Sequence, residues 1–316
     1  MSFAFVFPGQ GSQSVGMLGS LAAEPALRAT FDEASGVLGY DLWQLVSAGP
    51  EAALNSTERT QPAMLAAGVA VWRVWRARGG ASPAVVSGHS LGEFTALVCA
   101  GALDYPATVD LVRFRGQVMQ EAVPAGSGAM AAVLGLEDET LIAVCREAAG
   151  DAVVEAVNFN CPSQVVIAGD AAAVRRAIDA AKARGAKRAV MLPVSVPSHS
   201  SLMRGAGERL RGKLATLTVR APAIPYVSAV DAHAHAQPED IRDVLVRQIS
   251  SPVRWTNTLR ALIGSGVAQV IECGPGKVLT GLNRRIERRP DVGFLALEDP
   301  ASIDTALGAT GAAAHA

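Results

Sequence analysis

Charge is scarce in this 316-residue sequence, and its two signs nearly cancel. Charged residues make up 18% of the chain, and 28 basic against 29 acidic side chains leave a formal net charge of −1. A protein that holds a nucleic-acid backbone usually carries a broad positive field, which replaces the counterions of the phosphates. We therefore expect no nucleic acid among its partners.

Cysteine is scarce too, and no two cysteines form a CxxC pair, the spacing typical of zinc sites and redox-active disulfides. We therefore predict no metal site and no disulfide framework, and we expect structural thiols in a reducing compartment. The cysteines are Cys99, Cys145, Cys161 and Cys273.

Long apolar runs are missing as well, although half of the residues are hydrophobic. No run approaches the roughly 18 residues that cross a bilayer. The apolar run at residues 3–7 has no basic flank and meets Pro8 at once, so it is too short for a signal peptide. We therefore expect a cytoplasmic protein with no membrane partner and a large core, built as one domain with an insert or as two domains.

The first third of the chain alternates short apolar strands with helical segments. Residues 3–7 and 82–88 are predicted to be buried strands, and residues 61–78 a helix with a basic C-terminal end. This order favours parallel pairing with helices on both faces of the sheet. Elements that would complete the same domain are expected at residues 224–230 (strand), 239–249 (helix) and 267–279 (strand and glycine turn).

The middle of the chain follows the order β-α-β-β-α-β, which is typical of the ferredoxin-like split βαβ unit. We predict that residues 128–196 form a small inserted ferredoxin-like domain, and that residues 1–127 and 197–316 form the large α/β domain. Within the insert, strands are expected at residues 128–136, 153–160, 164–169 and 187–194, and helices at residues 137–149 and 171–185.

Residues 88–92, Gly-His-Ser-Leu-Gly, fit the G-x-S-x-G motif between a predicted strand and a predicted helix, which indicates a hydrolase-like parallel-sheet core. The turn would be too sharp for side chains at Gly88 and Gly92, and it would expose the Ser90 hydroxyl. We expect the helix to start at Ser90, so that its free N–H groups, that of Leu91 among them, face developing negative charge. The alternative is that Ser90 only caps this helix.

A serine nucleophile needs a base, because its hydroxyl reacts weakly at neutral pH. His199 stands where the insert returns to the large domain, a place suited to a cleft, although spacing alone makes a structural histidine as probable as a base. We expect His89 to pack or hydrogen-bond within its own turn. His233 and His235 fall in a polar, solvated loop, and His315 falls in a C-terminal tail expected to fray.

Six ordered segments resemble the malonyl-CoA:acyl carrier protein transacylases of fatty acid synthesis. The resemblance implies that Ser90 attacks malonyl-CoA and that the malonyl-serine ester passes its acyl group to the phosphopantetheine thiol of acyl carrier protein. No metal or redox cofactor is implied, since malonyl-CoA is a substrate. The segments are FAFVFPGQGSQ, GHSLGEFTALVCAGAL, RGQVMQEAVPAG, VNFNCPSQVVIAG, VSVPSHSSLM and ECGPGKVLTGL.

The family pattern also implies roles for individual residues. It pairs Ser90 with His199 as the base, whose imidazole a main-chain carbonyl at Gln248 orients. The backbone N–H groups of Gln10 and Leu91 would hold the oxyanion.

The family's substrate-reading arginine falls on Arg115, whose planar guanidinium can hold the malonyl carboxylate through two charge-assisted hydrogen bonds. Without the family, Arg115 would be interpreted as a solvated helix arginine. Asn158 and Asn160 are weaker candidates for contacts across the cleft, and they are equally compatible with asparagines satisfied within a turn.

Other functions use the same motifs. A serine hydrolase would resolve the ester with water, and a scaffold protein would use no nucleophile. Discrete polyketide acyltransferases and the malonyltransferase subunit of malonate decarboxylase are related possibilities. An acidic carrier would need a local basic patch, for which the candidates are residues 182–188 and the group Arg284, Arg285, Arg288 and Arg289, either of which could also be a plain solvated surface.

Overall fold

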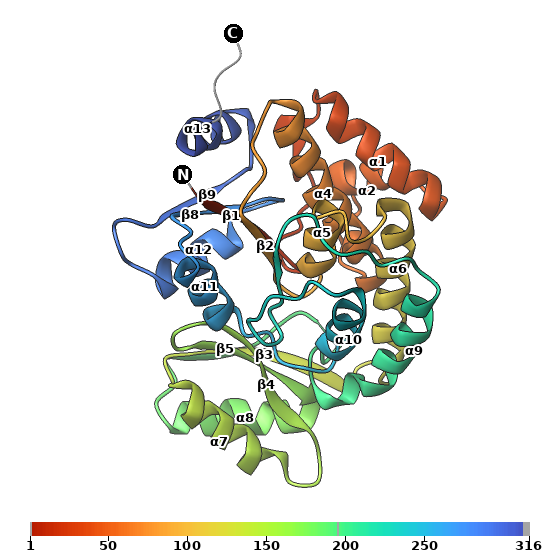
Figure 1. Ribbon diagram of the computed structural model, residues 1–316. Helices are drawn as coiled ribbons and strands as arrows, with labels where there is room; N and C mark the ends of the chain where they lie inside the picture. Colours follow the sequence, from red (N-terminus) through yellow and green to blue (C-terminus); the bar gives the residue numbers. More distant parts are fainter. Residues whose placement is uncertain (1, 195, 312–316) are drawn as a thin grey trace.

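The computed structural model describes residues 2–194 and 196–311, and a five-stranded parallel sheet forms the centre of its larger part (Figure 1). The strand order is β7-β2-β1-β8-β9, with every neighbouring pair parallel. The strands are β1 (Phe3–Phe7), β2 (Val85–Gly88), β7 (Tyr226–Val227), β8 (Gln269–Glu272) and β9 (Gly293–Ala296).

Strand β1 shows why this sheet is apolar on both faces. Phe5 packs in one hydrophobic cluster with Trp75 of α4 (Thr57–Ala77), whereas Val6 belongs to another cluster with Leu259 of α11 (Trp255–Gly264). Successive side chains of a strand point to opposite faces, so a strand covered by helices on both sides is an unbroken apolar run. The helices of this part are α1 (Pro25–Leu38), α2 (Leu42–Ala48), α3 (Glu51–Leu54), α4 (Thr57–Ala77), α5 (Gly92–Cys99), α6 (Tyr105–Glu121), α9 (Arg204–Ala215), α10 (Pro238–Gln248), α11 (Trp255–Gly264), α12 (Val278–Ile286) and α13 (Pro300–Thr310), with short 3-10 turns at Gly19–Leu21 and Ser201–Met203.

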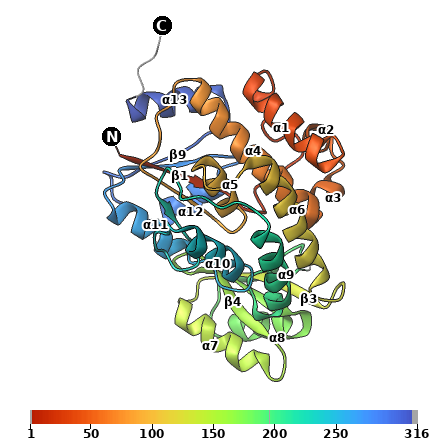
Figure 2. The ribbon, with the colours of Figure 1, turned by 45° about the vertical axis from the view of Figure 1, so that its right-hand side comes forward.

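A second, antiparallel sheet lies below the parallel one in both views, with α7 and α8 on its outer face (Figure 1, Figure 2). Its order β4-β5-β3-β6 and the chain order β-α-β-β-α-β are those of a ferredoxin-like unit, as predicted. The predicted fold class, a hydrolase-like parallel-sheet core with a small ferredoxin-like insert, is confirmed. The domain boundaries at residues 127/128 and 196/197 stay a prediction. The elements are β3 (Gly128–Leu134), α7 (Asp138–Ala149), β4 (Val154–Cys161), β5 (Gln164–Asp170), α8 (Ala171–Ala183) and β6 (Arg188–Met191).

Several local expectations differ from the structure. Helix α5 begins at Gly92 and not at Ser90, because Ser90 has a left-handed backbone with φ 52°. Helix α13 continues to Thr310, into the segment expected to fray, because its buried Ile303 and Ala306 pack it against the core. The tail prediction for His315 falls outside the described residues. Strand β9 was not predicted at all.

Within the described part of the chain, no helix is long and apolar enough to cross a membrane.

Candidate active site

The Gly-His-Ser-Leu-Gly turn lies at the carboxyl ends of β2 and of the central strand β1. The His89 N–H donates to the Phe7 carbonyl at 2.9 Å, which joins the turn to the end of β1. A Cβ added to Gly88 would lie 2.0 Å from the carbonyl carbon of Gly92, and one added to Gly92 would lie 2.0 Å from the Phe7 oxygen. Both glycines are therefore required by close backbone approach, as the motif predicts.

Ser90 and His199 meet although 109 positions separate them in the chain, and Ser90 Oγ lies 2.8 Å from His199 Nε2. His199 Nδ1 lies 2.8 Å from the Gln248 carbonyl oxygen. A carbonyl oxygen only accepts, so Nδ1 carries the proton and Nε2 is free to accept from the serine hydroxyl. Both residues have left-handed backbones, with φ 52° at Ser90 and φ 67° at His199. Such strained conformations cluster at functional sites.

The electrostatics of the pair favour a neutral imidazole. His199 is buried, with 4% of its surface exposed. Burial, followed by the nearby charge of Arg115, holds the pKa of His199 far below the ordinary value of an imidazole. A neutral Nε2 within hydrogen-bond distance of a hydroxyl is what a general base needs.

Arg115 reaches the same place from α6. Its Nη2 lies 3.4 Å from Ser90 Oγ and 2.9 Å from Gln248 Oε1, and its Nη1 lies 2.9 Å from Gln61 Oε1 of α4. Burial lowers the pKa of Arg115 to about 10, and the Glu93 carboxylate opposes that shift. The guanidinium therefore stays charged at neutral pH.

Not every N–H of Arg115 is in use. A guanidinium has five N–H donors, and three of them face the acceptors just described. Nε is buried and has no hydrogen-bond partner among the described residues. The site thus holds a buried cation with donors to spare beside the serine hydroxyl, which suits an anionic substrate group. The interpretation of Arg115 as a solvated helix arginine is wrong, because only 2% of its surface is exposed.

A cavity of about 580 Å³ opens at the serine and is lined by the antiparallel sheet on one side and by loops and helices of the larger part on the other. Asn158 and Asn160 of β4 lie in its wall, two residues apart on one face of the strand. His89 hydrogen-bonds its own backbone, which is the bonding within the turn that was expected. Its Nε2 also lies 2.9 Å from Asn160 Oδ1 of the small sheet. The His89 ring also lies 5.7 Å from that of Trp255. The hydrogen bond to Asn160 links the turn to the insert.

Gln10 and Leu91 lie in the wall of the same cavity as Ser90. The loop that carries Gln10 touches the serine turn, since a Cβ on Gly9 would lie 2.5 Å from the His89 carbonyl oxygen. Within the described part of the chain, the N–H groups of Gln10 and Leu91 donate to no backbone acceptor. Both are thus available to a ligand.

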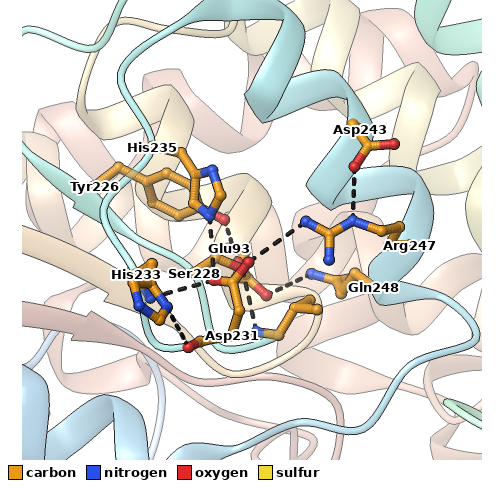
Figure 3. Close-up of polar contacts among 10 residues, drawn as sticks. Glu93, Tyr226, Ser228, Asp231, His233, His235, Asp243, Arg247 and Gln248 are labelled. Atoms are coloured by element: carbon orange, nitrogen blue, oxygen red, sulfur yellow. Dashed lines mark hydrogen bonds and ion pairs between the residues drawn. The ribbon is translucent and has the colours of Figure 1, made fainter.

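The side chain of Gln248 and the carboxylate of Glu93 were missed by the sequence reasoning. Gln248 Nε2 donates to the Ser90 carbonyl at 2.9 Å and to Glu93 Oε1 at 2.9 Å. Glu93 is 1% exposed and lies within the apolar helix α5. Figure 3 shows Glu93 beside Gln248. A lone acidic residue in the run GEFTALVC was the available signal, because a buried charge needs partners.

The remaining histidines lie elsewhere. His235 Nε2 lies 3.1 Å from Asp231 Oδ1, and its ring is 6.5 Å from that of Tyr226. The His235 side chain is only 13% exposed, whereas a side chain in a solvated loop was expected. His233 is bonded to the backbone oxygen of Asp231 in the same loop, at 2.7 Å. Neither of them lines the cavity that holds Ser90.

Comparison with known proteins gives consistent matches over nearly the whole chain. A family model described as an acyl transferase domain matches residues 4–290. The malonyl CoA-acyl carrier protein transacylase of Escherichia coli (strain K12) is 53% identical over 306 residues, covering 96% of this chain and 98% of that protein.

Two solved structures show the same likeness in three dimensions. An acyl carrier protein S-malonyltransferase from Vibrio cholerae has a TM-score of 0.94 at 54% identity, covering 97% of this chain and 100% of that one. A malonyl-transacylase solved in complex with a type II PKS acyl-carrier protein, PlMCAT:AntF, has a TM-score of 0.96 at 52% identity, covering 98% of this chain and 100% of that one.

Proposed function

This chain belongs to the malonyl CoA-acyl carrier protein transacylase family, and from that premise we propose how its own residues carry out the reaction. The enzyme is an acyltransferase that moves the malonyl group from malonyl-CoA to acyl carrier protein. The roles of the individual side chains follow from the geometry of the cavity. The observation that carries them is the convergence of Ser90 Oγ with His199 Nε2 at 2.8 Å and with Arg115 Nη2 at 3.4 Å.

In the first half-reaction, Ser90 Oγ attacks the thioester carbonyl of malonyl-CoA while His199 Nε2 takes the hydroxyl proton. The carbonyl oxygen becomes an oxyanion, which the N–H groups of Gln10 and Leu91 hold. When the intermediate collapses, the carbon–sulfur bond breaks, and His199 returns the proton to the sulfur of the leaving coenzyme A. A malonyl ester remains on Ser90.

In the second half-reaction, the phosphopantetheine thiol of acyl carrier protein gives its proton to His199, and its sulfur attacks the ester carbonyl. The ester bond to Ser90 Oγ then breaks, and His199 protonates the serine. Malonyl carrier protein leaves, and the enzyme returns to its initial state. Each step balances with the residues at hand, and we therefore propose that no metal or redox cofactor takes part.

The malonyl carboxylate is the group that Arg115 holds in this scheme. Charge-assisted hydrogen bonds from a planar guanidinium suit a carboxylate better than any neutral acyl end. Arg115 Nε has no acceptor among the described residues, so the guanidinium keeps donor capacity for the carboxylate. Because Arg115 lies next to Ser90 Oγ, the carboxylate end is held close to the carbonyl under attack.

We further propose that the reaction serves fatty acid synthesis and takes place in the cytoplasm. All four cysteines are buried free thiols, which suits a reducing compartment. A polyketide pathway is the second candidate, because the transacylase solved with a type II PKS carrier is 52% identical to this chain. Transfer rates to purified carriers of the two pathways separate these possibilities.

The direct test is the mass of the intact protein after a brief exposure to malonyl-CoA. The wild type should gain one malonyl group, and Ser90→Ala should gain none. Addition of holo acyl carrier protein should then remove the adduct and produce malonyl carrier protein. A serine hydrolase would lose the adduct at the same rate with or without the carrier, which would contradict the assignment as a transferase.

A further inference from the structure

Glu93 is a buried carboxylate next to the active site, and the steps above give it no role. It lies in the first turn of α5, and its N–H donates to the Ser90 carbonyl at 3.0 Å. Glu93 does not line the cavity that holds Ser90. Its side chain lies beside Tyr226, Ser228 and Gln248 (Figure 3). Burying a carboxylate is costly unless its oxygens are fully hydrogen-bonded.

Every identified partner of this carboxylate is a donor. Glu93 Oε2 accepts from the Tyr226 hydroxyl, and Oε1 accepts from Gln248 Nε2 at 2.9 Å. Ser228 and the Ala229 N–H hydrogen-bond it as well. Burial raises the pKa of Glu93, and these donors oppose the shift because they stabilise the ionised form.

The carboxylate is one of three groups that together fix the orientation of the Gln248 amide. Glu93 Oε1 and the Ser90 carbonyl oxygen both only accept, so the NH₂ group of Gln248 must face them, at 2.9 Å each. The amide oxygen of Gln248 then faces Arg115 Nη2, also at 2.9 Å. A flipped amide would set its oxygen against the carboxylate and its NH₂ group against the guanidinium, which are two repulsive contacts.

Gln248 therefore contacts both His199, the base, and Arg115, the cation that binds the substrate. Its main-chain carbonyl accepts from His199 Nδ1 at 2.8 Å, while its side chain occupies one donor of Arg115. Glu93 is also an acidic group whose charge favours the protonated form of Arg115. The neighbouring Arg247 pairs with Asp243 and Asp231, so its own charge is already balanced (Figure 3).

We propose that Glu93 is a positioning residue for malonyl selection. By fixing the amide of Gln248 it determines which N–H groups of Arg115 are left for the malonyl carboxylate, and it balances the charge of that guanidinium. The inference rests on the proposed function, since it assumes that Arg115 binds the carboxylate. Its consequence is that loss of the Glu93 charge weakens malonyl transfer more than acetyl transfer.

The experiment compares kcat/KM for malonyl-CoA and acetyl-CoA in the wild type and in Glu93→Gln. We expect the malonyl value to fall by about tenfold or more, which corresponds to one charge-assisted interaction. The acetyl value should fall less, so that the malonyl-to-acetyl ratio drops.

The matched control is Glu272→Gln. Glu272 is another fully buried glutamate, which accepts from the Leu279 and Thr280 N–H groups at 3.0 and 2.7 Å. Glu272→Gln also removes a buried charge and should lower stability for the same reason as Glu93→Gln. It should leave the malonyl-to-acetyl ratio of kcat/KM as in the wild type.

A second variant, Gln248→Met, tests the route of the effect, because it removes the amide and keeps the main-chain carbonyl. The ratio should drop as in Glu93→Gln, and the double variant should lose little more than either single one, since the two residues act as a unit. If Glu93→Gln does not fold, the ratio measured in Gln248→Met still decides the proposal.

An unchanged ratio in the folded variants, or fully additive losses in the double variant, would overturn the role of Glu93. These results are distinct from a failure of the proposed function. In that case the wild type itself would form no malonyl adduct on Ser90.

Discussion

Replacement of Arg115 by methionine separates substrate binding from general packing. Methionine keeps much of the length of the side chain and removes the charge and the donors. Arg115 is 2% exposed, so solvent screens its interaction with a carboxylate only weakly. Loss of a charge-assisted hydrogen bond costs about 1.5 to 3 kcal/mol, or roughly 10- to 150-fold in malonyl kcat/KM.

Acetyl transfer should respond differently to the same change. An acetyl group has no carboxylate, and it leaves the spare donors of Arg115 buried without an acceptor. The malonyl-to-acetyl ratio of kcat/KM should therefore fall in Arg115→Met. The assay is transfer to holo acyl carrier protein from each thioester, measured at several concentrations with both proteins.

The variant should also change the base. The charge of Arg115 is the second cause of the low pKa of His199, so its removal should raise that pKa and move the acid limb of the pH profile upward. Equal losses for both thioesters, with an unchanged pH profile, would refute the reasoning. Arg115 would then be a structural residue, and malonyl selectivity would have another source.

Three further predictions concern the base and the carrier. His199→Ala should slow formation of the malonyl adduct by about 100-fold or more, the usual contribution of a general base; an unchanged acylation rate would place the base elsewhere. Because the pKa of His199 is lowered, the imidazole stays neutral as the pH falls through the range where a free imidazole protonates. Acylation measured by rapid quench should therefore stay constant from about pH 8 to about pH 6, and a fall near the free value of about 6.5 would contradict this. Arg284→Glu with Arg288→Glu should weaken carrier-dependent transfer and reduce its sensitivity to salt, whereas unaltered kinetics would show that the carrier docks elsewhere.

The chemistry of the nucleophile could be predicted from the sequence because it is local. A serine between two glycines after an apolar strand needs only neighbouring residues to form its turn, and the close approach at Gly88 and Gly92 is the physical reason for the pattern. The ferredoxin-like insert could also be predicted from the periodicity of its strands and helices. The chain order of its four strands and two helices leaves few alternative topologies.

The remaining parts of the site depend on contacts between distant segments. His199 lies 109 positions from Ser90, and spacing alone left it as probable a structural histidine as a base. The family resemblance supplied the pairing, and the structure brings Ser90 Oγ and His199 Nε2 to 2.8 Å. The burial of Arg115 had no local signal, because a charged residue on a helix is ordinarily solvated.

The local elements follow from the amino-acid sequence alone, because the glycine turn, the apolar strands and the alternation of the insert depend on backbone sterics and side-chain periodicity. Which polar groups face one another depends on the folded structure. The bonds of Glu93 and Arg115 to Gln248 join residues 155 and 133 positions apart. A hydrogen bond of this kind depends on how helices and loops pack around the sheet, and no pattern within a short window encodes that packing.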